Sequence, residues 1–404
     1  MIHRYVIVGG GLAAASAIEG IRAHDREGSI LLVSRENHSP YHRPPLSKGL
    51  WFGKETLDKL PVHDDAFYVE NGVTLATRRE VVELDPQARR LWDDRGVQYG
   101  YEKLLLATGG RPRLLDATVD PQSNVHYFRT LEDYLVLREN LQRVQHTVVV
   151  GGGFIGLEIA AALRHAGTEV TLIYRDEYPL RRVLPRDLGL AVADYYRQQG
   201  VETVSNDAIA ELVEHGGMIE GRTRLGNTLT TQQVVVGIGI VPHVELAEAA
   251  GLEVGAGIEV DEYGRTSDPH VYAAGDVAEF PHLALQKRMR IEHWDHAKHH
   301  GLAAGANMAG ANERYDHIPM FWSDFFDLGW EAVGDLDSGL DVDPVWAREL
   351  AEGVLFYTHE DVVRGVLLWN SWDKVEWARG LIREAKPMSH EERVAAVPES
   401  APHA

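Results

Sequence analysis

The sequence predicts an α/β fold with two successive βαβ units, followed by a smaller C-terminal α+β domain. A glycine-rich turn joins a short apolar stretch to a helical pattern twice, once at Gly9 and once at Gly151. The separation of 142 residues is too long for a solenoid repeat and suits one α/β domain following another. Six of the nine tryptophans lie beyond Phe321, which marks the start of the third domain.

Each unit is predicted to run from strand to turn to helix to strand. In the first unit the predicted strands span residues 4–8 and 29–34, and the helix spans residues 12–23. In the second unit the predicted strands span residues 147–150 and 169–174, and the helix spans residues 154–165. Further strands are predicted at residues 103–107, 233–236 and 271–273, each running into a glycine or a Gly-Arg-Pro turn.

Length and composition exclude several classes of protein. The 404 residues predict two or three domains, and 40 basic against 61 acidic residues give a net charge of −21. This acidic excess argues against nucleic acid and anionic lipid as partners. Because the chain has no cysteine, it cannot use disulfides, thiolate metal ligands or a redox-active dithiol. Any redox chemistry must therefore be carried by a cofactor.

No apolar run reaches the roughly 18 residues that a membrane span needs, so we expect a soluble protein. The apolar stretch after His3 and Arg4 also resembles a secretory signal. The return of the same glycine pattern in mid-chain favours the βαβ interpretation instead.

Both turns match the pattern Gly-x-Gly-x-x-Gly/Ala. The first glycine allows the tight turn, the second lets the backbone approach a pyrophosphate, and the third position permits close helix packing. The helix N-terminus then offers N–H groups and a positive dipole to the phosphates. A single copy is weak evidence, but two copies in matching contexts predict two bound dinucleotides. The matching residues are Gly9, Gly11 and Ala14 in the first turn and Gly151, Gly153 and Gly156 in the second.

Two more segments complete a specific set of motifs: Leu-Ala-Thr-Gly-Gly at residues 106–110, and residues 266–276, which end in Ala-Ala-Gly-Asp. With them the sequence resembles the pyridine nucleotide-disulfide reductase superfamily of flavoproteins, whose two Rossmann-like domains are of the glutathione-reductase type. The resemblance implies that the first unit binds FAD and the second binds NADH or NADPH. Asp276 then matches the residue that binds the ribityl chain of the flavin, although an acid after a glycine also suits a helix N-cap.

The resemblance also implies the domain boundaries. We expect a discontinuous FAD-binding domain, an NAD(P)H-binding domain, a C-terminal α+β domain and a flexible tail. These span residues 1–110 with 245–318, residues 111–244, residues 319–385 and residues 386–404, respectively.

The segment Pro-Tyr-His-Arg-Pro-Pro-Leu-Ser-Lys at residues 40–48 narrows the resemblance. It is similar to a segment of the ferredoxin reductases of oxygenase systems and of apoptosis-inducing factor. These proteins lack the redox-active cysteine pair, which agrees with the absence of cysteine here. Residues 290–297, 320–324 and 368–370 are closer to the apoptosis-inducing factor branch.

Within that branch, Arg43 is expected near the FAD pyrophosphate and Lys48 beside the reactive edge of the flavin, paired with Glu158. A cation there favours electron density arriving on the ring. Phe154 and Trp322 match aromatic positions that line the nicotinamide pocket. Surface charges and core aromatics are the alternatives. Further expected cofactor contacts are Thr108, Gly109, Gly239, Glu292, His293 and Trp294, with a structural role as the alternative for His293.

The strand ends that usually carry a ribose-binding acid differ from the family pattern. In the first unit Arg35 stands at the expected place, so Glu36 is the candidate one residue later. In the second unit Arg175 with Arg181 resembles a phosphate clamp for NADPH. Asp176 instead matches an acid that holds the 2′-hydroxyl of NADH. The choice stays open, with branch similarity favouring NADH.

We therefore expect an FAD-dependent NAD(P)H oxidoreductase that passes a hydride to flavin and then electrons to an acceptor such as a ferredoxin or a quinone. The alternative is a redox-sensing interaction protein like apoptosis-inducing factor, with slow NADH oxidation and a long-lived charge-transfer complex. We expect a monomer or homodimer and, without a mitochondrial leader, a cytoplasmic location. The histidines at 293, 296, 299 and 300 lack acids at convincing ligand spacing, so no metal site is expected.

Overall fold

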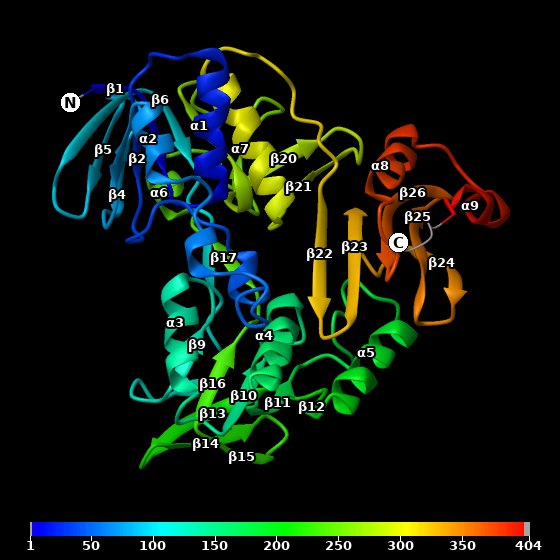
Figure 1. Ribbon diagram of the computed structural model, residues 1–404. Coiled ribbons are helices and arrows are strands. Elements are labelled where there is room, and N and C mark those ends of the chain that lie inside the picture. The colour runs from blue at the N-terminus through cyan, green and yellow to red at the C-terminus, as the bar shows by residue number, and fades with distance from the viewer. Residues whose placement is uncertain (1, 400–404) are drawn as a thin grey trace. The chain divides into compact units, whose positions relative to one another are not determined.

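The computed structural model describes residues 2–399, which cluster into two compact units (Figure 1). Unit 1 comprises Met1–His42, Asp58–Arg111 and Val241–Pro319. Unit 2 comprises Arg43–Leu57, Pro112–Ile240 and Met320–Ala404. None of the helices formed by the described residues combines the length and apolar character required to cross a membrane.

Unit 1 is built on a seven-stranded sheet in which β1 is flanked by β2 and β6, both parallel to it. The side chains of Val6 and Ile7 are fully buried, as expected for a strand covered on both faces. The strand order is β3-β2-β1-β6-β5-β4, with β19 also pairing with β6. Their bounds are β1 Ile2–Val8, β2 Ile30–Val33, β3 Val73–Ala76, β4 Val81–Asp85, β5 Arg90–Asp93, β6 Gln98–Leu106 and β19 Val271–Ala273.

Helices α1 (Leu12–His24) and α7 (Trp294–Met308) pack side by side against this sheet (Figure 1). A Cβ at Gly301 or Gly305 would lie closer than 3.0 Å to the backbone of α1, so these glycines permit the close approach. The other elements of unit 1 are α2 Asp65–Glu70, α6 Glu245–Ala249, η3 Gly275–Val277 and a small sheet of β18 Ile258–Glu259, β20 Ala278–His282 and β21 Lys287–Met289.

Unit 2 contains a five-stranded parallel sheet in the order β12-β11-β10-β16-β9. Its strands are β9 Val125–Tyr127, β10 His146–Val150, β11 Glu169–Ile173, β12 Val201–Val204 and β16 Gln233–Val236. Its helices are α3 Leu131–Asn140, α4 Phe154–His165 and α5 Arg186–Gln198. A four-stranded sheet adds β8 Thr118–Val119, β13 Ile209–His215, β14 Met218–Thr223 and β15 Thr228–Thr231.

The rest of unit 2 is a five-stranded antiparallel sheet in the order β22-β23-β26-β25-β24, with two helices. Fully buried Trp330 and Trp369 lie at the centre of this sheet on β23 and β26, which explains the tryptophan-rich sequence. The bounds are β22 Met320–Phe325, β23 Leu328–Gly334, β24 Asp341–Arg348, β25 Glu352–His359, β26 Val362–Trp369, α8 Val375–Glu384 and α9 His390–Ala396. The short strands β7 (Gly110–Pro112) and β17 (Ile240–Pro242) pair with each other, and 3-10 turns occur at η1 Pro44–Leu46 and η2 Leu57–Lys59.

The structure differs from the predicted organisation in two places. The segment Arg43–Leu57, which we placed in the first domain, clusters with unit 2 because Ser47 and Lys48 bond to Glu158 there. The predicted flexible tail contains helix α9 instead of irregular chain. Its Arg393 is buried and forms a 2.6 Å ion pair with Asp343. The last part of the predicted tail, residues 400–404, lies outside the described residues.

Candidate functional site

The first glycine of each turn is required by the protein itself. Gly9 has φ of +135° and Gly151 has φ of +128°, a region that other residues rarely adopt. A Cβ at Gly9 would come closer than 3.0 Å to the carbonyl of Ala107, and one at Gly151 would do the same with Gly237. Any larger residue at either position must distort the strand next to it.

The second glycine of each turn has no such reason in the protein. Gly11 and Gly153 are the N-cap residues of α1 and α4, with φ of −101° and −89°, which any residue can adopt. Apart from its immediate chain neighbours, a Cβ at either position meets no atom of residues 2–399 within 4 Å. The remaining reason for a glycine is space for a ligand, because the backbone must approach a pyrophosphate there. Both turns therefore fit a dinucleotide.

The third position packs the helix against the turn. Ala14 on α1 is fully buried. On α4, a Cβ at Gly156 would collide with the carbonyl of Gly151, so only glycine fits. The two turns reach the same close packing with different residues because the second leaves less room.

The residue after the second strand lies beneath the middle glycine of each turn. A Cβ at Gly10 would collide with the side chain of Ser34, and a Cβ at Gly152 would lie 2.9 Å from Cβ of Tyr174. Tyr174 is 3% exposed, and burial raises the pKa of its phenol. Tyr174 therefore fills a packing position. A tyrosine at this place is compatible with an acid that binds the ribose of NADH at a neighbouring residue.

Two residues further on, each strand end carries an acid in the same backbone position. The carbonyl of Glu36 accepts a 3.1 Å hydrogen bond from the N–H of Arg78, and the carbonyl of Asp176 accepts one of 3.1 Å from Asn206. Arg78 and Asn206 have nearly equal φ values of 55° and 56°. Glu36 and Asp176 are therefore corresponding residues of the two units.

The surroundings of these two acids differ. The phenol of Tyr41 donates a 2.6 Å hydrogen bond to Oε2 of Glu36. Asp176 is 53% exposed and lies 3.6 Å from Nη1 of Arg181. Arg175 is exposed beside it. The structure thus brings Arg181 to Asp176, so one of the two predicted clamp arginines is engaged by a carboxylate.

A buried ionic cluster in unit 2 surrounds Glu158, whose side chain is 4% exposed. Lys48 Nζ lies 2.9 Å from Oε1 of Glu158 and also donates to the carbonyl of Trp322 at 3.3 Å. Ser323 Oγ donates to Oε1 at 2.7 Å, and Ser47 Oγ donates to Oε2 at 2.6 Å. Both carboxylate oxygens are therefore used, which fixes the ammonium of Lys48 in place.

The predicted pair of Lys48 and Glu158 is thus brought together, but sequence reasoning missed the two serines. Ser47 precedes Lys48 and Ser323 lies on β22, 165 residues beyond Glu158 on α4. Ser47 belongs to the same segment that suggested Lys48, so its position was a usable signal. Ser323 follows Trp322 in a segment that we had singled out, but nothing in the sequence pairs it with α4.

The two predicted aromatic residues occupy different settings. The ring of Phe154 packs edge-on against Phe321 and tilted against Trp330, with 5.4 Å between ring centroids in each case. Phe154 is only half-buried, so its place at the nicotinamide stays a prediction. The indole of Trp322 lies beside the cluster, with Lys48 Nζ 5.8 Å from its ring centroid, a cation–π distance.

Three other predicted cofactor residues follow strands next to the turns, whereas Arg43 is bonded elsewhere in unit 2. Nη1 of Arg43 donates to the carbonyl of Arg129 at 3.0 Å. Thr108 Oγ1 donates to the carbonyl of His243 at 2.9 Å, and Gly109 and Gly239 have positive φ of 59° and 94°. Thr108 and Gly109 follow the end of β6 next to the first turn, as Gly239 follows the end of β16 next to the second.

The remaining predicted residues lie in unit 1 around Arg290. It donates to the carbonyl of Asp276 at 2.9 Å and pairs with Glu292 at 2.6 Å. The N-cap of the 3-10 turn at Asp276 is Ala274, so the capping alternative for Asp276 does not hold. At the start of α7, His293 is the N-cap residue, and burial lowers its pKa to about 4. The indole of the neighbouring Trp294 donates to His42 Nδ1 at 3.0 Å.

Family comparisons agree with this geometry. The family of pyridine nucleotide-disulphide oxidoreductases matches residues 3–301, which include both glycine turns. The chain belongs to this family. A second family, the C-terminal region of mitochondrion-associated apoptosis-inducing factor, matches residues 304–352.

Individual relatives narrow the assignment. The ferredoxin–NAD(+) reductase component of the anthranilate 1,2-dioxygenase system of Burkholderia cepacia is 36% identical, over 83% of this chain and 82% of that protein. Apoptosis-inducing factor 1 of Dictyostelium discoideum is 31% identical, over 94% of this chain and 78% of that protein. The crystal structure of the covalent putidaredoxin reductase–putidaredoxin complex matches with a TM-score of 0.91 and 31% identity, over 99% of this chain and 97% of that one.

These findings confirm the family resemblance, the fold class and the branch of ferredoxin reductases and apoptosis-inducing factors. The chain is an FAD-dependent oxidoreductase that uses a pyridine nucleotide and, having no cysteine, no redox-active thiol. The individual contacts of each cofactor remain predictions.

Proposed function

We propose that this chain oxidises NADH and passes the electrons, through FAD, to a small iron–sulfur protein of the ferredoxin type. The observation that carries the proposal is the pair of turns whose second glycines, Gly11 and Gly153, face open space. Unit 1 would hold FAD and unit 2 the pyridine nucleotide. The names of the relatives, a ferredoxin–NAD(+) reductase component and a putidaredoxin reductase, supply the acceptor class.

The flavin, when bound, accepts a hydride from the nicotinamide and releases electrons singly, so no residue of the chain needs to be a redox group. The chain contributes orientation and charge. The N–H groups at the start of α1 and α4 would hold a pyrophosphate, and Asp276 would offer acceptor oxygens to ribityl hydroxyls.

Lys48 is the residue proposed to favour negative charge on the flavin ring. A cation held at a fixed position in a poorly hydrated site stabilises developing charge without reorganising. Lys48 is 14% exposed and is fixed by Glu158, whose own orientation is set by Ser47 and Ser323. The two serines would therefore act as positioning residues for the ammonium.

The correspondence between Glu36 and Asp176 supports NADH over NADPH. A carboxylate at this place accepts hydrogen bonds from ribose hydroxyls and repels a 2′-phosphate. Asp176 also lies 3.6 Å from Arg181, so the guanidinium that would serve a phosphate clamp already faces an acid. In unit 1 the corresponding Glu36 would hold the adenosine ribose of FAD.

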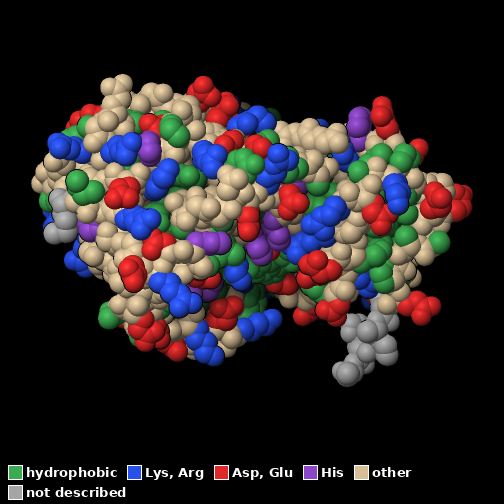
Figure 2. Space-filling model, turned by 90° about the horizontal axis from the view of Figure 1, so that it is seen from above, with side chains coloured by type: hydrophobic (Ala, Val, Ile, Leu, Met, Phe, Trp, Pro, Cys, Tyr) green, Lys and Arg blue, Asp and Glu red, His purple; other side chains and the backbone are tan. Residues whose placement is uncertain are grey.

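Docking of an acidic ferredoxin would need a local basic patch on this chain, because the net charge of −21 is unfavourable. On the face shown in Figure 2, Lys and Arg side chains are interspersed with Asp and Glu.

The match of residues 304–352 to the C-terminal region of apoptosis-inducing factor favours a second candidate function. In it, slow NADH oxidation leaves a long-lived charge-transfer complex that changes the partners of the protein. Kinetics separate the two candidates, because an electron-transfer enzyme must reoxidise quickly.

The test is stopped-flow reduction of the purified holoprotein with NADH, followed by mixing with a [2Fe–2S] ferredoxin. The proposal predicts rapid bleaching near 450 nm and rapid reoxidation by ferredoxin. A long-wavelength charge-transfer band that persists in the presence of ferredoxin would favour the sensor instead. Separate titrations with NADH and NADPH decide which nucleotide the protein uses. If the same concentration of either nucleotide bleaches the flavin equally, the preference for NADH is rejected.

A further inference from the structure

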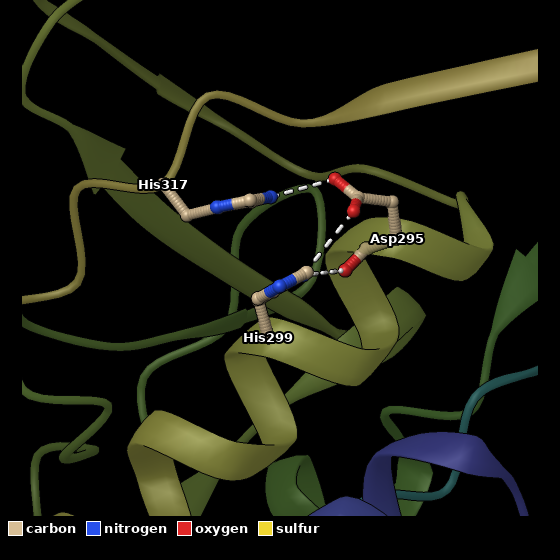
Figure 3. Close-up of side chains that lie close together, drawn as sticks. All are labelled: Asp295, His299 and His317. Atoms are coloured by element: carbon tan, nitrogen blue, oxygen red, sulfur yellow. Dashed lines mark hydrogen bonds and ion pairs between the residues drawn. The ribbon is translucent and has the colours of Figure 1, made fainter. Parts of the chain in front are cut away.

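Three metal-binding side chains of unit 1 converge at the start of α7 (Figure 3). Asp295 lies in the first turn of α7, His299 lies one turn later, and His317 lies on the segment that follows the helix. Residues four apart on a helix share one face, so Asp295 and His299 point to the same side. One ligand atom from each of the three residues lies within 4.8 Å of the others.

Each of the two imidazoles contacts a different oxygen of the Asp295 carboxylate. His317 Nε2 lies 2.6 Å from Oδ2 of Asp295, and His299 Nδ1 lies 3.2 Å from Oδ1. The rings stack with 3.8 Å between centroids and an interplanar angle of 17°. Figure 3 shows that both imidazole nitrogens lie directly against oxygens of Asp295, so two nitrogen ligands and one carboxylate are gathered at one place.

The helix that carries Asp295 and the segment that carries His317 are both fixed by packing and hydrogen bonds. Gly301 and Gly305 bring α7 into close contact with α1, which fixes the helix that carries Asp295. The residues flanking His317 are also anchored. Tyr315 is buried and its N–H donates to the carbonyl of Glu262 at 2.7 Å, while Ile318 is fully buried. The cluster is therefore preorganised rather than assembled from mobile loops.

We propose that Asp295, His299 and His317 form a binding site for a divalent transition-metal ion of the zinc class. Two imidazole nitrogens and one carboxylate oxygen are the ligands that such ions prefer, at about 2.0–2.2 Å. Hard ions such as Mg²⁺ and Ca²⁺ prefer all-oxygen sites. An ion bound here would replace the direct contacts of His299 and His317 with the carboxylate of Asp295.

The exposure of the side chains leaves room for solvent ligands. Asp295 is 8% exposed, whereas His317 is 20% and His299 is 36% exposed. The ion would thus have three protein ligands and at least one water. Without the ion, His299 Nδ1 donates to the backbone carbonyl of Asp295 at 2.8 Å. Metal binding at Nδ1 would break this hydrogen bond and place the proton of the neutral imidazole on Nε2.

This inference departs from our expectation of no metal site. The sequence shows Asp295 and His299 at helical spacing, but two ligands alone do not make a site. The third, His317, lies beyond the end of α7 and reaches the cluster only through the fold.

The test is zinc binding to the full-length, FAD-loaded protein after treatment with a chelator, measured by calorimetry and elemental analysis. We expect one equivalent of Zn²⁺, unaffected by millimolar Mg²⁺. His317→Gln and Asp295→Asn should each weaken the affinity by more than about tenfold. Zinc K-edge absorption of the wild-type protein should show two imidazole ligands, and this readout does not depend on a variant folding.

The matched control is His390→Gln. His390 also pairs with an aspartate, Asp343, at 2.9 Å, but His390 is exposed and Asp343 has Arg393, not a second imidazole, as its other partner. This variant should bind Zn²⁺ as the wild type does. The proposal is overturned if zinc affinity is unchanged in His317→Gln with normal flavin content, or if the absorption spectrum shows fewer than two imidazoles. In that case the three side chains serve only to tie the chain to α7.

Discussion

The two units share the form of their glycine turns: the first glycine has positive φ and the second faces open space. The helices that follow differ at the residue seven positions after the first glycine. Unit 1 has Ser16 at that position on α1, a buried hydroxyl for which the described residues provide no hydrogen-bond partner. Unit 2 has Glu158 on α4, with three donors. The two turns thus share a backbone, while Glu158 gives unit 2 a fixed cation, Lys48, at a position where unit 1 has an uncharged serine.

The residues that follow the second strand of each unit can be compared in the same way. Ser34 and Tyr174 fill the space beneath the middle glycines, so the residue type there follows the room available. The acids two residues later, Glu36 and Asp176, are conserved between the units in position and backbone bonding. The acids recur in both units, whereas the residues beneath the middle glycines differ.

The largest effects should follow from Gly9→Ala and Gly151→Ala. Each places a Cβ against a backbone carbonyl in a region of positive φ, which we expect to cost roughly 4 kcal/mol or more of unfolding free energy. Gly9→Ala should lose FAD, and Gly151→Ala should keep FAD but bind NADH poorly. Thermal unfolding and the ratio of absorbance at 450 and 280 nm check this, and flavin loss from both variants alike would break the comparison.

Glu158→Gln should have the next largest effect, because it leaves the ammonium of Lys48 without its main counter-charge. Breaking a buried pair costs about 3–5 kcal/mol, and we expect the lower end because Lys48 is 14% exposed. Denaturant unfolding and the rate of flavin reduction measure the result. Ser16→Ala is the matched control on α1 and should be neutral or slightly stabilising. Equal loss in the two variants would contradict the distinct role of Glu158.

Ser47→Ala and Ser323→Ala sharpen the same contrast with smaller effects. Each removes one hydrogen bond to a carboxylate, worth about 1.5–3 kcal/mol. Both should slow flavin reduction without changing FAD content, and the double variant should show coupling because the serines share one carboxylate. If the double variant reduces flavin as fast as the wild type does, the serines do not position Lys48. Strictly additive effects on the rate would show that the two serines act independently.

The smallest effect should come from Asp176→Asn. Losing the negative charge should raise KM for NADH and lower it for NADPH, changing their ratio by about tenfold, or 1.4 kcal/mol. The control is Glu177→Gln at the neighbouring acid, which pairs with Arg186. The converse change, Arg175→Ala with Arg181→Ala, should leave NADH oxidation nearly unchanged. A much larger increase in KM for NADPH than for NADH would favour the hypothesis that the two arginines bind the 2′-phosphate of NADPH.

The local parts of the fold could be predicted from the sequence, because strand, turn and helix patterns are short-range. The helix at residues 154–165 and the strands at residues 233–236 and 271–273 match the observed bounds of α4, β16 and β19. Helix α9 was also within reach, since Ser389 and Glu392 form a capping box that the sequence displays. We overlooked it because the flanking residues lack an apolar stripe.

Long-range contacts could not be predicted in the same way. Residue types and family motifs suggested Lys48 and Glu158, but the contact of Ser323 with Glu158 spans 165 residues and depends on how β22 reaches α4. The packing role of Tyr174 likewise appears only once Gly152 is seen above it. Such contacts follow from tertiary packing, which a single sequence does not reveal.

The central claim is that two glycine turns hold two different dinucleotides. The most direct measurement compares Gly11→Ala with Gly153→Ala by flavin content and by NADH titration, because a methyl group at either position touches no atom of residues 2–399 beyond its chain neighbours. Both variants should unfold within about 0.5 kcal/mol of the wild type. Gly11→Ala should lose FAD, while Gly153→Ala should stay yellow and need far more NADH for reduction. Unchanged FAD content and unchanged NADH titration in both variants would contradict the account.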